Sequence, residues 1–275
     1  MTINCNGQLI DVSTPKVMGI LNVTPDSFFD GARYTNEREI LLRVEQMLAD
    51  GATFIDVGGY STKPNAAEVS VQEEKARTIP VVTSIMHHFP EAILSIDTFR
   101  SDVAQLCLDQ GAAIVNDISA GFLDPLMLKI VANYQVPYIM MHMKGTPQTM
   151  TTLTQYDDLV KEMLYYFSER IAAARSLGIS DLIVDPGFGF AKTIDQNFEL
   201  LHHLELFKSL ELPVLAGVSR KSMIHKTLEI KPEEALNGTT VLNTLALEKG
   251  ATILRVHDVK EAVETIRLWE KVALK

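Results

Sequence analysis

The chain has 275 residues, 47% of them hydrophobic, and a formal net charge of −10 at pH 7. That length suits one large barrel domain or two small ones. The acidic balance argues against broad nucleic-acid binding, which relies on a basic surface. The two cysteines, Cys5 and Cys107, form neither a metal motif nor a disulfide framework. Because no signal-peptide pattern or membrane-spanning apolar run is present, we expect a cytoplasmic protein with no membrane partner.

Short β-rich apolar runs recur along the whole chain. They lie at Val17–Val23, Phe54–Gly59, Ala92–Thr98, Ile114–Ser119, Pro137–Met143, Leu182–Pro186, Val214–Ser219 and Ile253–Asp258. Most of them lack polar and apolar alternation, which is typical of parallel strands that are covered on both faces.

Amphipathic helical patterns fill the intervals between these runs. They lie at Glu37–Asp50, Val71–His88, Arg100–Gln110, Asp124–Asn133, Tyr156–Leu177, Asp195–Leu210 and Pro232–Lys249, with a last one around Trp269. Strands that alternate with helices over about 250 residues predict a single-domain (β/α)8 TIM barrel spanning residues 1–275. A doubly wound open sheet is the alternative, but neither a Gly-x-Gly-x-x-Gly turn nor a Walker loop supports it.

Polar residues near the strand ends are the candidates for an active site, because this fold builds its site at the C-terminal ends of the strands. They are Asn22, Asp56, Asp97, Asn116, His142, Asp185, Ser219, Lys221, Arg255 and His257. Any one of them could merely cap a helix or satisfy loop amides. Together, the acidic and amide groups suit a flat heterocycle rich in N–H groups, and the basic groups of the last two strands suit an anion.

Eight motifs in order resemble the signatures of the dihydropteroate synthases. They are Met18–Phe28, Asp56–Pro64, Ser95–Thr98, Asn116–Gly121, Met141–Pro147, Asp185–Phe190, Gly217–Lys221 and Arg255–Asp258. The resemblance implies a barrel transferase of folate biosynthesis. Its members condense 6-hydroxymethyl-7,8-dihydropterin diphosphate with p-aminobenzoate to give 7,8-dihydropteroate and diphosphate. It also implies a homodimer and Mg²⁺ as cofactor.

The resemblance assigns a role to each matching residue. The expected pterin-binding residues are Asp97, Asn116, Ile118, Met141, Asp185, Phe190, Leu215, Gly217, Lys221 and Arg255. The expected diphosphate contacts are Asn22, Arg255 and His257, with Asn22 also serving the metal ion. The expected p-aminobenzoate site, which sulfonamides would share, comprises Phe28, Thr62, Pro64 and Ser219, the last at a helix start.

Catalysis is expected to depend on Asp97, Lys221 and Arg255, with diphosphate leaving before the amine attacks a cation-like pterin methylene. Three positions in the second motif depart from the family pattern. Tyr60 replaces an acid, Lys63 replaces an arginine and Asn65 replaces a glycine. These departures bear on loop closure and sulfonamide sensitivity, whereas the expected pterin residues are unaffected.

Three other functions compete with this interpretation. Lys221 could form a Schiff base in a lyase, with Arg220 depressing its pKa, but Lys221 lies in a loop and not within an apolar strand. A pterin-binding folate methyltransferase of the same barrel group would not be expected to keep both p-aminobenzoate loops. A non-catalytic pterin-binding module would have no use for a diphosphate clamp.

Overall fold

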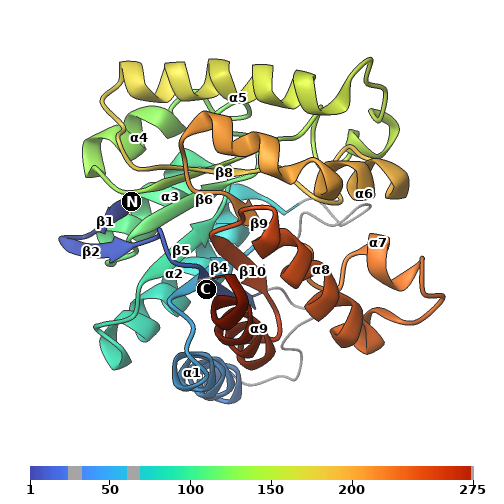
Figure 1. Cartoon of the computed structure of the whole chain (residues 1–275). Helices are drawn as coiled ribbons and strands as arrows, with labels where there is room; N and C mark the ends of the chain where they lie inside the picture. Colours follow the sequence, from blue (N-terminus) through green and yellow to red (C-terminus); the bar gives the residue numbers. More distant parts are fainter. Residues whose placement is uncertain (24–32, 61–68, 274–275) are drawn as a thin grey trace.

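The structure is a computed structural model that describes residues 1–23, 33–60 and 69–273. Parallel strands form a barrel at the centre of the molecule, and the helices surround it (Figure 1). The strands are β3 (Lys16–Asn22), β4 (Phe54–Gly58), β5 (Leu94–Asp97), β6 (Ile114–Asp117), β7 (Tyr138–Met141), β8 (Leu182–Asp185), β9 (Leu215–Ala216) and β10 (Ile253–Val256). Their order is β8-β7-β6-β5-β4-β3-β10-β9.

The two ends of this sheet meet, so that the barrel is nearly closed. Val184 and Val214 form a parallel bridge between β8 and the start of β9. The Val184 N–H also donates to the Pro213 carbonyl at 3.0 Å. The predicted single-domain (β/α)8 barrel is therefore confirmed.

The helices agree with most of the predicted intervals. They are α1 (Arg33–Ala49), α2 (Val71–His88), α3 (Ser101–Asp109), α4 (Met127–Tyr134), α5 (Leu159–Ser176), α6 (Ile194–His202), α7 (Ser222–His225), α8 (Leu236–Glu248) and α9 (Val259–Ala273). Two predicted helices are each divided into an α-helix and a 3-10 turn, at Leu204–Leu210 and at Pro232–Glu234. The short helix α7 follows the strand end at which the sequence predicted a helix start. Within the described ranges, no helix has the length and apolarity that a membrane crossing requires.

Each strand is apolar on both faces because one face looks into the barrel and the other packs against helices. On β4, for example, Ile55 and Val57 belong to the outer layer between strands and helices. Phe54 belongs instead to an inner ring, together with Met18, Ile93, Ile114, Ile139, Ile183, Leu215 and Ile253. The absence of alternation in the sequence therefore has a structural reason.

An N-terminal hairpin closes the end of the barrel at which the strands begin. Its strands are β1 (Thr2–Cys5) and β2 (Gln8–Asp11), which pair antiparallel. Ile3, Cys5 and Val12 are buried against the inner ring. The hairpin was not predicted, because its burial depends on the barrel that it covers. With this end filled, the barrel interior is left to the C-terminal ends of the strands.

Candidate active site

Polar side chains lie one layer above the inner apolar ring. Along β4, β6, β8 and β10, each of them follows an inner apolar residue by two positions, and side chains two apart on a strand share a face. The pairs are Phe54 and Asp56, Ile114 and Asn116, Ile183 and Asp185, and Ile253 and Arg255. The alternation that fills the barrel floor with hydrocarbon therefore aims these polar groups into the same interior.

Arg255 links two of the carboxylates across the barrel. Its Nε donates to Asp56 Oδ2 at 2.6 Å and its Nη2 donates to Asp97 Oδ2 at 2.7 Å. The Asn116 side chain donates to the same Asp56 oxygen at 3.0 Å. Asp56 is fully buried, and its Oδ1 has no hydrogen-bond partner within the described part of the chain. Asp56 is a strand-end residue for which the sequence predicted no role, although its position two residues after Phe54 marks it as inward-facing.

More carboxyl groups than cations face this interior. Burial raises the pKa of Asp97 to about 7, although Arg255 opposes the shift. Burial also raises the pKa of Asp185, against the effect of Lys221. The Arg255 guanidinium is disfavoured by burial, but Asp56 and Asp97 outweigh that effect and raise its pKa. Because one arginine serves two carboxyl groups, the arginine stays charged, and Asp97 loses its proton at a higher pH than an ordinary carboxyl group does.

Lys221 reaches the interior from the loop after β9. Its Nζ donates to the Phe188 carbonyl and lies 5.0 Å from the centre of the Phe190 ring. Burial lowers the pKa of Lys221 to about 8, while Asp185 acts in the opposite direction. A Cβ at Gly189 would lie 3.3 Å from Lys221 Cδ. The lysine stem therefore passes through a space that the missing glycine side chain leaves open.

An apolar wall stands beside these polar groups. Ile118, Met141, Met143, Met150 and Ala191 form one buried cluster, with Phe99, Leu123 and Phe190 packed against it. Three of the expected pterin-wall residues (Ile118, Met141 and Phe190) therefore lie together. Leu215 belongs to the inner ring below, and a Cβ built at Gly217 would lie 4.0 Å from it. The combination of a polar interior and a flat apolar side suits a planar heterocycle.

Ser219 and His257 contact each other at the neighbouring ends of β9 and β10. The Ser219 hydroxyl and His257 Nδ1 are 3.0 Å apart, and the His257 N–H donates to the same hydroxyl at 3.2 Å. The prediction that Ser219 stands at a helix start is wrong. Helix α7 begins three residues later, at Ser222, because the chain first makes a left-handed turn at Arg220 (φ 56°).

Arg220 secures that turn. Its guanidinium makes two hydrogen bonds to Asp258, from Nε at 2.9 Å and from Nη2 at 2.5 Å. Its N–H donates to the buried Thr239 hydroxyl at 3.0 Å. The loop that carries Lys221 is thus tied to the end of β10 that carries His257.

Asn22 ends β3 opposite Gly58 of β4 and is half-buried. The residues that follow it, 24–32, are not among the described residues 1–23, 33–60 and 69–273. No group of three acidic, histidine or cysteine side chains in those ranges could hold a metal ion without help. The predicted p-aminobenzoate residues Phe28, Thr62 and Pro64, and the departures Lys63 and Asn65, lie outside the described residues.

Tyr60, the remaining departure from the family pattern, is buried beside this end of the barrel. Its ring meets the Phe99 ring edge-on at a centroid distance of 5.4 Å, and Arg100 Cζ lies 5.2 Å from the ring centre. Its hydroxyl accepts a hydrogen bond from the Gln148 side chain at 2.8 Å. A neutral aromatic residue is therefore well accommodated at this position.

His142 faces away from the interior. Its ring packs on the Tyr166 and Phe167 rings, and Lys192 Nζ lies 3.2 Å from its Nδ1. Burial lowers the pKa of this histidine well below its usual value. His142 is therefore a strand-end residue with a structural role. Its ring is packed among other side chains and does not reach a substrate in the barrel.

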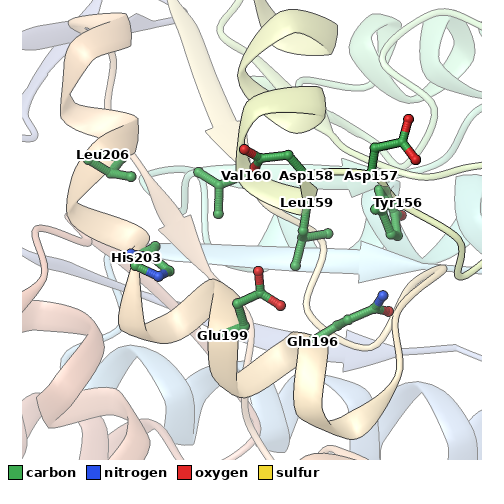
Figure 2. A pocket seen from close by; sticks show the side chains of 9 residues that line it. All are labelled: Tyr156, Asp157, Asp158, Leu159, Val160, Gln196, Glu199, His203 and Leu206. Atoms are coloured by element: carbon green, nitrogen blue, oxygen red, sulfur yellow. The ribbon is translucent and has the colours of Figure 1, made fainter.

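A surface pocket of about 500 Å³ lies outside the barrel, between the start of α5 and α6 (Figure 2). It is lined by Tyr156, Asp157, Asp158, Leu159, Val160, Gln196, Glu199, His203 and Leu206. None of the polar residues of the barrel interior takes part. This pocket is therefore separate from the candidate site.

Comparisons with known proteins agree with this arrangement. The model of a family described as "Pterin binding enzyme" matches residues 18–257. The chain belongs to the pterin-binding enzyme family. Its relatives in this family include the dihydropteroate synthase of Escherichia coli K12, which is 45% identical over 98% of this chain and 96% of that protein. The dihydropteroate synthase of Haemophilus influenzae is 39% identical over 99% of both chains.

Solved structures of family members show the same fold. The Yersinia pestis dihydropteroate synthase in a sulfonamide drug complex superposes with a TM-score of 0.93 at 41% identity, covering 100% of both chains. The Xanthomonas albilineans enzyme in complex with 7,8-dihydropteroate superposes with a TM-score of 0.86 at 35% identity, covering 98% of both chains. The resemblance drawn from the sequence motifs is thereby confirmed.

Proposed function

We infer that this member of the pterin-binding enzyme family is a dihydropteroate synthase, a transferase of folate biosynthesis. It joins 6-hydroxymethyl-7,8-dihydropterin diphosphate to p-aminobenzoate and releases diphosphate. The observation that carries this conclusion is the ring of Asp97, Asn116, Asp185, Lys221 and Arg255 inside the barrel. Relatives of nearly the same length support it, and they do not support a methyltransferase or a Schiff-base lyase.

We propose that the pterin ring lies flat between the interior polar groups and the apolar wall. Asp185 and Asn116 suit the N–H groups of the aminopyrimidinone, because they offer acceptor oxygens in a buried place. Lys221, which already donates to a carbonyl oxygen, suits the oxygen and ring nitrogen of the pterin. Ile118 and Met141 would contact the ring plane.

Arg255 stands where it can act on both the ring and the leaving group. Its guanidinium is held by Asp56 and Asp97 and keeps a side-chain exposure of 19%, so part of it remains accessible. A guanidinium favours the negative charge that develops on a departing diphosphate. His257, which the Ser219 hydroxyl holds at the end of β10, is the second proposed contact of the diphosphate.

A magnesium ion fits this arrangement, and we propose it as the cofactor. The Asn22 amide oxygen is a hard donor of the kind that Mg²⁺ accepts, and this ion usually takes its other ligands from substrate phosphates and water. That coordination agrees with the absence of an all-protein ligand cluster within the described residues. When bound, the ion would supply positive charge to the diphosphate.

The chemistry then needs no covalent enzyme intermediate. Loss of diphosphate leaves a pterin methylene with cationic character, and the Asp97 carboxylate is the proposed group that stabilises it. The p-aminobenzoate amine attacks that carbon, and its proton leaves to solvent or to a nearby base. Phe28, Thr62, Pro64 and Ser219 are the proposed residues around p-aminobenzoate. Sulfonamides are the expected competitors, since a related structure holds one.

Diphosphate release tests the proposed reaction. We expect turnover from the pterin diphosphate with Mg²⁺ to require p-aminobenzoate and to yield dihydropteroate. We expect it to collapse in Lys221→Ala, which removes the proposed hydrogen-bond donor to the pterin. Pterin binding without any diphosphate release, at any p-aminobenzoate concentration, would indicate a binding module instead.

A homodimer is proposed from the outer face of two adjacent helices. Val241 and Leu245 of α8 are 50% and 47% exposed, and Leu268 and Val272 of α9 are 72% and 78% exposed. Helices α8 and α9 pack against each other, and their exposed apolar side chains are the proposed interface. Analytical ultracentrifugation should give the dimer mass, and Leu268→Glu should lower it to the monomer mass. A monomeric wild-type protein would refute the proposal.

The cytoplasmic location stays a prediction.

A further inference from the structure

The loop between β8 and α6 has an unusual backbone shape. Gly187, Gly189 and Ala191 all have positive φ, at 71°, 81° and 49°. Such angles are unfavourable for residues other than glycine, so Ala191 needs support from its surroundings. At Gly187 a Cβ would lie 2.3 Å from the His142 carbonyl oxygen, which shows how closely the loop packs on the end of β7. This shape turns several carbonyl groups toward the inside of the loop.

Lys192 fills the inside of that loop. Its Nζ lies 3.0 Å from the Gly187 carbonyl, 3.0 Å from the Phe190 carbonyl and 3.2 Å from His142 Nδ1. An ammonium group has three donors and no acceptor, so these three contacts use all of them. Only 9% of the residue is exposed.

The charge state of this lysine follows from its contacts. Burial lowers the pKa of Lys192 to about 7, and Asp185 opposes that shift. The three acceptors around Nζ favour the ammonium over the amine, which has one N–H fewer to donate. His142 matches this arrangement, because its lowered pKa leaves a neutral ring whose Nδ1 can accept. The Nζ atom is thus enclosed by the loop, and Lys192 is not available as a nucleophile.

The same loop determines the geometry of the proposed pterin site. The Phe188 carbonyl accepts the hydrogen bond of Lys221, and the Phe190 ring lies beneath Lys221 Nζ. Phe190 also packs on the apolar wall beside Ile118. A change in the loop backbone would therefore move both the cation and one side of the wall.

We propose that Lys192 is a positioning residue for pterin binding, which fixes the loop after β8 so that Phe190 and Lys221 stand where the pterin ring requires them. The inference rests on the proposed dihydropteroate synthase function. Lys192 itself touches neither substrate, because its three donors point into the loop. Its effect should therefore fall on the affinity for the pterin and not on the capture of p-aminobenzoate.

The test compares Lys192→Met with Lys129→Met, in which an exposed lysine of α4 is changed in the same way. Methionine keeps most of the length of the side chain and removes all three donors. Calorimetry with the pterin diphosphate alone should give a Kd that is weaker by about 10-fold for Lys192→Met, as expected when one hydrogen-bonding interaction with the ligand is lost. The KM for p-aminobenzoate should stay close to that of the wild type, and Lys129→Met should match the wild type in both measurements.

The outcomes separate the two proposals. A wild-type protein that fails to bind the pterin would overturn the proposed function, whereas equal binding by wild type and a cooperatively folded Lys192→Met would overturn the role of Lys192. If Lys192→Met does not fold, nitrogen NMR of the wild type tests the proposal instead, by showing which ring nitrogen of His142 carries the proton. We expect the proton on Nε2, with Nδ1 accepting from Lys192. A proton on Nδ1 would refute the proposal, because a donor would then face the ammonium.

Discussion

Asp56→Asn tests whether the buried pair with Arg255 holds the site together. The substitution keeps the shape of the side chain but removes its charge. Asp56 is fully buried, and Arg255 Nε lies 2.6 Å from its Oδ2. Removing one partner of a buried ion pair costs about 3–5 kcal/mol, because the remaining charge loses its compensation. Asp97, at 2.7 Å from Arg255 Nη2, continues to compensate part of that charge.

We therefore expect a loss near the lower end of that range, about 3 kcal/mol. In a chain of this size it corresponds to a fall in Tm of roughly 6–12 °C. The activity should fall further than the stability suggests. Asp56 also accepts from Asn116, so that two proposed pterin contacts lose their anchor. We expect kcat/KM for the pterin diphosphate to decrease by about 100-fold.

Urea denaturation and steady-state kinetics measure the two effects. The matched control is Asp102→Asn, which removes the charge from a surface pair with Lys75 at 3.1 Å. Because the Asp102 side chain is 67% exposed, its loss should cost less than about 1 kcal/mol and leave the kinetics unchanged. An Asp56→Asn variant with wild-type stability and wild-type kcat/KM would refute the view that this carboxylate positions Arg255.

Three further predictions concern pH, backbone shape and the diphosphate contact. The raised pKa of Asp97, about 7, means that the folded state holds this proton longer than the unfolded chain does. The stability advantage of wild type over Asp97→Asn in urea should therefore fall as pH rises from about 4 to 7, and a constant difference would contradict the shift. Gly187→Ala should unfold at lower urea, because its Cβ would lie 2.3 Å from the His142 carbonyl oxygen; wild-type stability would contradict the loop geometry. Ser219→Ala should raise the KM for the pterin diphosphate, because it removes the hydroxyl that lies 3.0 Å from His257 Nδ1. An unchanged KM would show that this hydroxyl does not position His257 for the diphosphate.

The position of the polar groups inside the barrel could be predicted largely from the sequence. Strand periodicity is a local property, so a residue two positions after a buried apolar residue shares its face wherever the strand goes. This rule places Asn116, Asp185 and Arg255 in one interior once the strands form a barrel. It also places Asp56 there, although no role was assigned to it.

The partners of these groups could not be predicted in the same way. Asp56 and Arg255 are 199 positions apart in the chain, and their contact exists only because β3 joins β4 to β10. The same limit explains why the sequence did not show that Ser219 bonds to His257, or that Lys192 fills the loop after β8.

The sequence by itself determined the barrel, the order of its strands and the family, because these follow from periodic burial and from short motifs. Only the tertiary structure decided which charges meet, which polar groups face away from the interior and which end of the barrel is filled. His142 and the N-terminal hairpin illustrate the last two points. The physical reason is that the energy of a buried charge depends on its neighbours in space, and barrel closure selects those neighbours from distant parts of the chain.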